Sequence, residues 1–164
     1  MEEVEQEYTH SSVAQLVTQG PQIKDKFGRA FNYLRIAVNE KCNLRCIYCM
    51  PEKGIFFEPQ NNLLTRKEII RIVKVVAKLG VNKIRFTGGE PLLRKDLVEL
   101  VSGAAETPGI DSLNLTTNGV LLANVVESLK DVGLTGVNVS IDTLEKEKYK
   151  EITRRDYIDQ ACKG

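Results

Sequence analysis

The sequence lacks a long apolar run, an excess of charge of either sign and a basic N-terminal region. No apolar stretch approaches the roughly 20 residues that a membrane-spanning helix needs. The net charge of +1 gives no basis for non-specific binding to nucleic acid or to a membrane surface. The first seven residues contain four glutamates, whereas a signal peptide begins with a positive region and a mitochondrial transit peptide is rich in arginine. We therefore expect a cytoplasmic protein that binds neither nucleic acid nor membrane.

Soft metal ligands are also few, because the chain has one histidine and four cysteines. Three of the cysteines stand together in a C-x3-C-x2-C pattern: Cys42, Cys46 and Cys49. Clustered thiolates select zinc, copper or iron–sulfur clusters, and a disulfide framework would prefer an even, dispersed set. A closed zinc site needs a fourth ligand, which would have to come from the distant His10 or Cys162. We favour a 4Fe-4S cluster with one iron open to a small molecule; zinc and simply buried thiols are the alternatives.

Composition and patterning indicate one globular domain preceded by an arm. The 164 residues are enough for one substantial core, and the hydrophobic content of 42% and charged content of 27% are ordinary for a globular protein. Residues 1–26 are polar, weakly patterned and interrupted by Gly20-Pro21. We expect a flexible N-terminal arm there, with an accessory helix as the alternative, and the domain itself in residues 27–164.

Short strands alternate with helices along this domain. Four stretches have the character of strands: residues 34–38, 83–87, 112–117 and 137–141. Five stretches have helical spacing: residues 69–79, 96–105, 122–132, 144–152 and 157–163. The first of these helices follows a capping box, Thr65-Arg66-Lys67-Glu68, and Gly80 supplies its stop. This order predicts an α/β fold in which right-handed βαβ units form a parallel sheet.

Each predicted strand has one polar face and one apolar face. Arg85 and Thr87, for example, alternate with Ile84 and Phe86. A half-solvated antiparallel sheet alternates in the same way, but the intervening helices argue against it. A doubly wound parallel sheet would be apolar on both faces, and a packed barrel would fill its interior with branched apolar residues. We therefore expect an α/β protein with a curved parallel sheet around a ligand-filled lumen.

The chemistry is expected at the carboxyl ends of the strands, where (β/α) barrels hold their active sites. The cysteine loop follows the first strand, and polar or glycine-rich turns follow the others: Gly88-Gly89-Glu90-Pro91, Thr117-Asn118-Gly119, and Ser140 with Asp142. Glycines after a strand would let the backbone approach a ligand closely. Arg35 and Arg85 fall on the inward faces of adjacent strands. Buried charge must be paired, and guanidinium suits phosphate or carboxylate, so we expect a polyanionic substrate in the lumen.

These motifs resemble those of a known family. The cysteine pattern, with Tyr48 before its last cysteine and Gly-Gly-Glu-Pro after the next strand, resembles the signature of the radical S-adenosylmethionine (SAM) enzymes. A narrower set of motifs, over residues 25–164, closely resembles the GTP 3′,8-cyclase family of molybdenum cofactor (molybdopterin) biosynthesis. The set comprises Asp25-Lys26-Phe27-Gly28-Arg29, Tyr33-Leu34-Arg35, Cys49-Met50-Pro51 and residues 85–94, 115–119 and 138–144.

The resemblance implies a lyase that converts GTP to (8S)-3′,8-cyclo-7,8-dihydroguanosine 5′-triphosphate through a 5′-deoxyadenosyl radical. By their places in the motifs, the SAM-binding 4Fe-4S cluster would be ligated by Cys42, Cys46 and Cys49. The SAM contacts would be Tyr48, Gly89 and Ser140. The GTP contacts would be Arg35, Arg85 and Thr116. The cluster and SAM would carry the chemistry, so no side chain is assigned a catalytic role, and a reductant protein would donate the electron.

The resemblance also implies the fold, a partial TIM-like (β/α) barrel of the radical SAM type, and it implies that the chain is incomplete, truncated to about four β/α units. In this family a C-terminal half completes the barrel and supplies further cysteines for a second cluster, whereas here only Cys162 follows Cys49. We expect residues 27–164 to be the N-terminal portion of the core domain, keeping the first cluster and much of the SAM site. An exposed edge at the strand 137–141 would allow pairing with another chain, as in a homodimer. The alternatives are another radical SAM enzyme, for example a peptide-modifying one, and a non-catalytic metal-binding or regulatory fragment.

Overall fold

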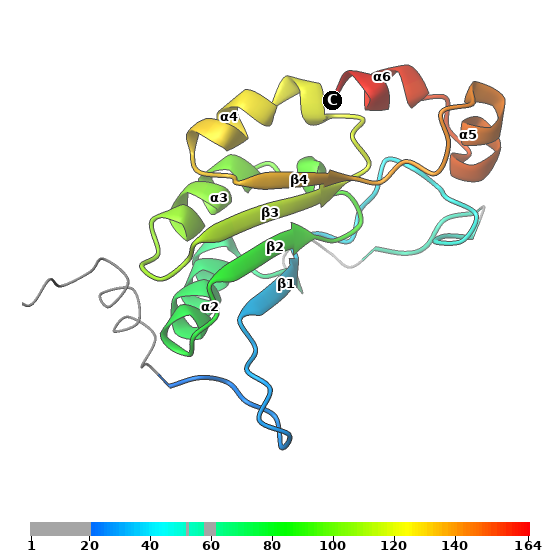
Figure 1. Ribbon diagram of the computed structural model, residues 1–164. Coiled ribbons are helices and arrows are strands. Elements are labelled where there is room, and N and C mark those ends of the chain that lie inside the picture. Colours follow the sequence, from blue (N-terminus) through cyan, green and yellow to red (C-terminus); the bar gives the residue numbers. More distant parts are fainter. Residues whose placement is uncertain (1–20, 52, 58–61) are drawn as a thin grey trace, which may run out of the picture.

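Four parallel strands form the centre of the structure (Figure 1). The computed structural model describes residues 21–51, 53–57 and 62–164. The strands are β1 (Tyr33–Ala37), β2 (Lys83–Thr87), β3 (Ser112–Thr117) and β4 (Gly136–Val139). They lie side by side in chain order, each parallel to the next. All four predicted strands are confirmed, and the largest difference is at β4, which ends two residues before the predicted end at 141.

Helices lie between the strands and after the last one, which confirms the α/β prediction. They are α2 (Arg66–Lys78), α3 (Leu97–Ala105), α4 (Val126–Asp131), α5 (Lys146–Thr153) and α6 (Ile158–Lys163). The capping box before α2 forms as predicted: the Thr65 hydroxyl accepts from the Glu68 N–H (3.3 Å), and the Thr65 N–H donates to the Glu68 carboxylate (2.8 Å). The described helices are all too short or too polar to traverse a lipid bilayer.

One predicted helix is interrupted in the structure, so the prediction of a continuous helix is wrong. Residues 122–132 form a short 3₁₀ turn, Leu122–Asn124, followed by α4. Val125 separates the two with φ −139° and ψ −7°, which is outside the helical region. A second 3₁₀ turn, Pro91–Leu93, precedes α3 and was not predicted. The apolar spacing was right, because Leu122 and Leu129 are both buried, but spacing alone does not reveal a break in the backbone.

The core lies on one face of the sheet. Phe86 of β2 and Leu115 of β3 are fully buried against α2, α3 and α4, which Figure 1 shows on the same side, whereas Val139 at the end of β4 is 41% exposed. Val73 of α2, Leu100 of α3 and Leu129 of α4 are fully buried in this layer. On the opposite face the side chains are half-buried or exposed, and they include polar residues predicted to line a lumen, such as Arg85, Asn114 and Thr116. The sheet therefore has one packed face and one open, polar face.

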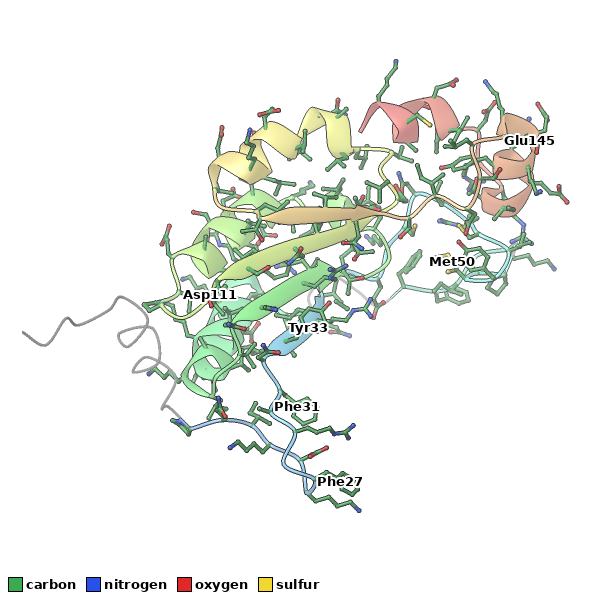
Figure 2. All side chains as sticks on the ribbon, in the orientation of Figure 1. Phe27, Phe31, Tyr33, Met50, Asp111 and Glu145 are labelled. Carbon is green, nitrogen blue, oxygen red and sulfur yellow. The ribbon has the colours of Figure 1, made fainter. Side chains whose placement is uncertain are left out.

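The predicted arm, residues 1–26, lies mostly outside the described residues, and so does His10. Its last six residues are described, and there the Ile23 N–H donates to the Leu79 carbonyl at the end of α2 (3.2 Å). Lys24 and Ala30 form an isolated antiparallel bridge that closes a loop. Figure 2 shows this loop projecting from the sheet with Phe27 near its tip. The chain thus reaches β1 by first passing the end of α2.

Candidate functional site

A cavity of about 240 Å³ lies at the carboxyl ends of the strands. It is lined by residues from five segments: the cysteine loop, the turns after β2, β3 and β4, and helix α5. Seven predicted site residues are among them: Cys42, Cys46, Tyr48, Cys49, Gly89, Thr116 and Ser140. Arg35 and Arg85 do not line the cavity. The prediction that the chemistry-bearing turns meet at this edge of the sheet is therefore confirmed for most of the set.

Helix α5 and the turn after it hold the cysteine loop in place. The backbone N–H groups of Arg45 and Ile47 donate to the carbonyls of Thr153 and Ile152, each at 2.9 Å. Arg154, in the left-handed conformation that ends α5, donates through Nη1 to the Met50 carbonyl (3.1 Å). Figure 2 places Met50 beside α5 accordingly. The loop is anchored by backbone contacts from a segment more than a hundred residues later in the chain.

The three loop cysteines are free thiols that line the same cavity. Cys42 and Cys46 are half-buried, and burial raises the pKa of both thiols. The Leu44 N–H points at the Cys42 sulfur (3.4 Å). Within residues 21–51, 53–57 and 62–164, no three metal-ligating side chains converge closely enough to hold one ion.

This donor set fits an iron–sulfur cubane better than zinc. A cubane takes each thiolate on a different iron, so the sulfurs need not converge on one point, whereas zinc draws its ligands to about 2.3 Å from a single ion. Three free thiols around one cavity supply three of the four cluster ligands. A bound cluster would favour the thiolate forms, against the effect of burial on the pKa of Cys42 and Cys46.

Glu90 connects the turn after β2 to the turn after β3. Its side chain is fully buried and accepts hydrogen bonds from the Leu92 N–H (3.0 Å), the Thr117 hydroxyl (2.8 Å) and the Asn118 N–H (2.8 Å). Burial raises the pKa of Glu90, and the three donors counter part of that effect. With its side chain fully engaged inside the protein, Glu90 positions the two turns.

The two glycines before Glu90 are needed for packing between loops. Gly88 has φ +142°, and a Cβ there would collide with the Asn39 carbonyl oxygen. A Cβ on Gly89 would collide with the carbonyl oxygens of Glu40 and Lys41. The Gly89 N–H also donates to the Asn39 carbonyl (2.9 Å). Besides the predicted approach of a ligand, these glycines have a second structural reason: the start of the cysteine loop lies directly on them.

Tyr48 and Asp142 close the cavity from opposite sides. The Tyr48 hydroxyl donates to the Asp142 carboxylate at 2.7 Å, which links the cysteine loop to the turn after β4. This hydrogen bond to a carboxylate, together with burial, raises the pKa of Tyr48. Both residues were singled out from the sequence, but their contact spans 94 positions and no local pattern indicates it.

Arg35 and Arg85 lie on the open face of the sheet, next to the cavity. They are opposite each other in the register of β1 and β2. Arg85 donates through Nη1 to the Thr116 hydroxyl (3.3 Å), and its Nε is buried without a hydrogen-bond partner among the described residues. Thr116 also lines the cavity, so the arginine pair and the cavity are continuous. A buried, unpaired guanidinium nitrogen is a place where an anion's oxygen would be stabilised.

Tyr149 and Thr153 of α5 were missed by the sequence argument, although both line the cavity. Tyr149 is 1% exposed, and its hydroxyl has no hydrogen-bond partner among the described residues. Burial raises the pKa of Tyr149 to about 12. Thr153 donates through its hydroxyl to the Tyr149 carbonyl (2.8 Å). Both fall on the apolar stripe of an ordinary helix, so only their contact with the cysteine loop reveals their place in the site.

Comparison with known proteins agrees with this geometry. The family model of the radical SAM superfamily matches residues 36–164. The chain belongs to the radical SAM superfamily. The matched region begins in β1 and includes the cysteine loop, all the turns that line the cavity and α5.

Two curated relatives are similar to this superfamily member over most of its length. A GTP 3′,8-cyclase of Listeria monocytogenes is 47% identical over 142 residues, which are 87% of this chain and 43% of the relative. The molybdenum cofactor biosynthesis protein moc-5 of Caenorhabditis elegans is 48% identical over 144 residues, which are 88% of this chain and 24% of the relative. The chain thus spans less than half the length of these relatives.

A solved structure supports the fold. Streptococcus suis SuiB, crystallised with S-adenosylmethionine, superposes with a TM-score of 0.62 over 96% of this chain and 35% of SuiB, at 21% identity. At that identity the likeness concerns the fold alone. It agrees with the partial (β/α) barrel that the family resemblance implies.

Proposed function

We propose that this chain provides the cluster- and SAM-binding part of a radical SAM GTP 3′,8-cyclase, a lyase of molybdenum cofactor biosynthesis. The observation that carries the proposal is the continuity of two features on one sheet edge. Three free thiols line a cavity, and Thr116 joins that cavity to a pair of arginines with an unpaired guanidinium nitrogen. The GTP 3′,8-cyclase of Listeria monocytogenes is 47% identical over 142 residues of this chain, which supports the assignment.

The cofactors would occupy the cavity. Cys42, Cys46 and Cys49 would ligate a 4Fe-4S cluster, which together with SAM would supply a 5′-deoxyadenosyl radical. Tyr48, Gly89 and Ser140 line the same cavity and would contact SAM. The Tyr48–Asp142 hydrogen bond would hold the cysteine loop over the bound cofactor and limit the entry of water.

The substrate would lie on the arginine face of the sheet. The triphosphate of GTP would supply the negative counter-charge that Arg35 and Arg85 do not find among the described residues. Thr116 offers a hydroxyl beside them. Orientation is the contribution that side chains can make to a radical reaction, because a fixed distance between the two nucleotides replaces a bimolecular encounter. The arginines would therefore set which ribose hydrogen faces the cavity.

A complete catalytic cycle needs partners beyond these residues. A reductant protein would deliver one electron to the cluster, and a reducing compartment such as the cytoplasm would keep the thiols available. The remaining wall of the substrate site would come from residues outside this sequence or from a second copy paired at the β4 edge. These partners are inferred from the chemistry and from the open polar face.

The test is anaerobic reconstitution with iron and sulfide, followed by EPR spectroscopy of the reduced protein with and without SAM. We expect a 4Fe-4S signal that changes on addition of SAM. Cys46→Ser should abolish the signal, whereas Cys162→Ser is the matched control and should retain it, because Cys162 lies on α6 and does not line the cavity. Absence of a cluster, or a cluster whose signal ignores SAM, would refute the assignment of the site. If the cluster responds to SAM but the protein does not bind GTP, the GTP cyclase assignment would be refuted and another radical SAM activity would be favoured.

A further inference from the structure

A second cavity, on the other side of the molecule, has the opposite chemistry. It has a volume of about 560 Å³ and runs between α2 and α3, on the side of these helices away from the core. Five cations of α2 line it: Arg66, Lys67, Arg71, Lys74 and Lys78. Among the described residues, Glu99 of α3 is the one acidic residue in its lining. We call this feature the basic groove.

The cations of the basic groove have no ion-pair partner among the described residues. Four of them recur at positions 67, 71, 74 and 78, which places them along one stripe of the helix. Like charges at this spacing repel one another, so the stripe destabilises α2 unless an anion lies along it. None of the five forms an ion pair with any residue in the described part of the chain. Val75, which also lines the groove, leaves 51% of its surface exposed.

The N-terminal twenty residues have the complementary composition. Residues 1–20 contain four glutamates (Glu2, Glu3, Glu5 and Glu7) and no lysine or arginine. They also contain apolar side chains, including Val13, Leu16 and Val17, that suit the exposed Val75. Charge and apolar character therefore match between this segment and the groove.

The first described residues of the chain lie at one end of this groove. The Ile23 N–H donates to the Leu79 carbonyl (3.2 Å), so the described chain begins at the C-terminal end of α2, next to Lys78. Helix α2 has 13 residues and is about 20 Å long at 1.5 Å per residue. The glutamates precede Gln22 by 15 (22 − 7) to 20 (22 − 2) positions. At about 3.3 Å per extended residue they can reach any cation of the groove.

We propose that residues 1–20 bind along the basic groove of the same chain, with the glutamate side chains against the cations of α2. This contact neutralises the repulsion along α2 and covers Val75. It is independent of the cluster and SAM site, which lies at the carboxyl ends of the strands. A second copy of the chain, or the acidic surface of another protein, would be the competing occupant of the groove.

Carbodiimide cross-linking of the full-length chain tests this, because it joins a carboxylate to an amine only where the two are in contact. We expect links from Glu2, Glu3, Glu5 or Glu7 to Lys67, Lys74 or Lys78, identified by mass spectrometry. Lys148 and Lys150, exposed on α5, are the control amines. The yield should fall several-fold in 1 M salt, where the Debye length is about 3 Å. Equal yields at the control lysines would overturn the proposal.

Two further measurements separate the competing occupants. In a mixture of unlabelled and ¹⁵N-labelled chains, links within one chain carry a single label, whereas mixed links would assign the groove to a second copy and overturn the proposal. Replacement of the four glutamates by glutamine should abolish the links and shift the backbone amide resonances of residues 66–78. If those resonances are unchanged in the folded variant, the N-terminal segment does not occupy the groove.

Discussion

Glu90→Gln is the perturbation that best tests how the site is held together. The carboxylate uses both oxygens: Oε1 accepts from the Leu92 N–H and the Thr117 hydroxyl, and Oε2 accepts from the Asn118 N–H. Glutamine has one oxygen and one NH₂ group. In either orientation its NH₂ faces at least one of these donors, so at least one hydrogen bond to a charged group is lost at a fully buried position. Such a bond contributes about 1.5–3 kcal/mol, and we expect the free energy of unfolding to fall by about 2 kcal/mol.

Urea denaturation at pH 7 measures this change. Glu151→Gln is the matched control, because Glu151 is exposed on α5 and the same substitution there should change the free energy of unfolding by less than about 0.5 kcal/mol. Both variants should have the m-value of the parent chain, because neither changes the surface exposed on unfolding. If Glu90→Gln were as stable as Glu151→Gln, the carboxylate would not be joining the two turns, and the reasoning would be wrong.

The pH dependence of the stability difference between the parent chain and Glu90→Gln tests the direction of the Glu90 pKa shift. Burial raises the pKa of Glu90 above its ordinary value of 4.5, so the folded state holds its proton more tightly than the unfolded state. Stability linked to this group is then fully present below pH 4.5 and is lost as the pH rises through the folded pKa. The stability difference between the parent chain and Glu90→Gln should therefore shrink with rising pH, which a series of urea titrations from pH 4 upward would show; a growing difference would contradict the raised pKa.

Three further predictions concern other parts of the structure. Thr65→Ala removes the hydroxyl that caps α2 and should lower the free energy of unfolding by about 1 kcal/mol, measured by urea denaturation. Tyr149→Phe removes a buried hydroxyl that has no partner among the described residues, so thermal unfolding should show equal or higher stability, by up to about 1 kcal/mol; a loss would reveal an unseen hydrogen bond. Arg85→Lys removes the unpaired Nε and should weaken GTP binding by about tenfold in calorimetry, whereas Arg71→Lys, on α2, should not.

The sheet could be predicted from sequence because its determinants are local. The alternation of Arg85 and Thr87 with Ile84 and Phe86 fixes which face is buried, and the same period fixes β3. The pairing of Arg35 with Arg85 follows once adjacent strands are parallel and their polar faces coincide. The break at Val125 was not predictable in this way, because a helix and a 3₁₀ turn bury nearly the same apolar positions.

The contacts that shape the site are non-local, and this is why the sequence argument missed them. Helix α5 was predicted only as the next helix, with no role in the site. Its backbone carbonyls nevertheless fix the cysteine loop, and its Tyr149 lines the cavity. The hydrogen bond from Tyr48 to Asp142 likewise depends on how two turns meet at the sheet edge. Patterns along a chain identify which residues are polar and which are buried, whereas such contacts depend on the completed packing.

Asn118 shows how closely the parts of the site depend on one another. Its backbone N–H donates to Glu90 (2.8 Å), while its side-chain Nδ2 donates to Asn43 Oδ1 (2.7 Å) and lies 3.8 Å from the Cys42 sulfur. One residue therefore ties the glycine-rich turn after β2 to the first cysteine of the loop. Hydrogen bonds near a cluster sulfur influence its reduction potential, and the position of the turn influences a cofactor bound beside it. A group held by the thiols and a ligand held by the turn would thus share one rigid connection, so neither binding event could rearrange its own half of the site without moving the other.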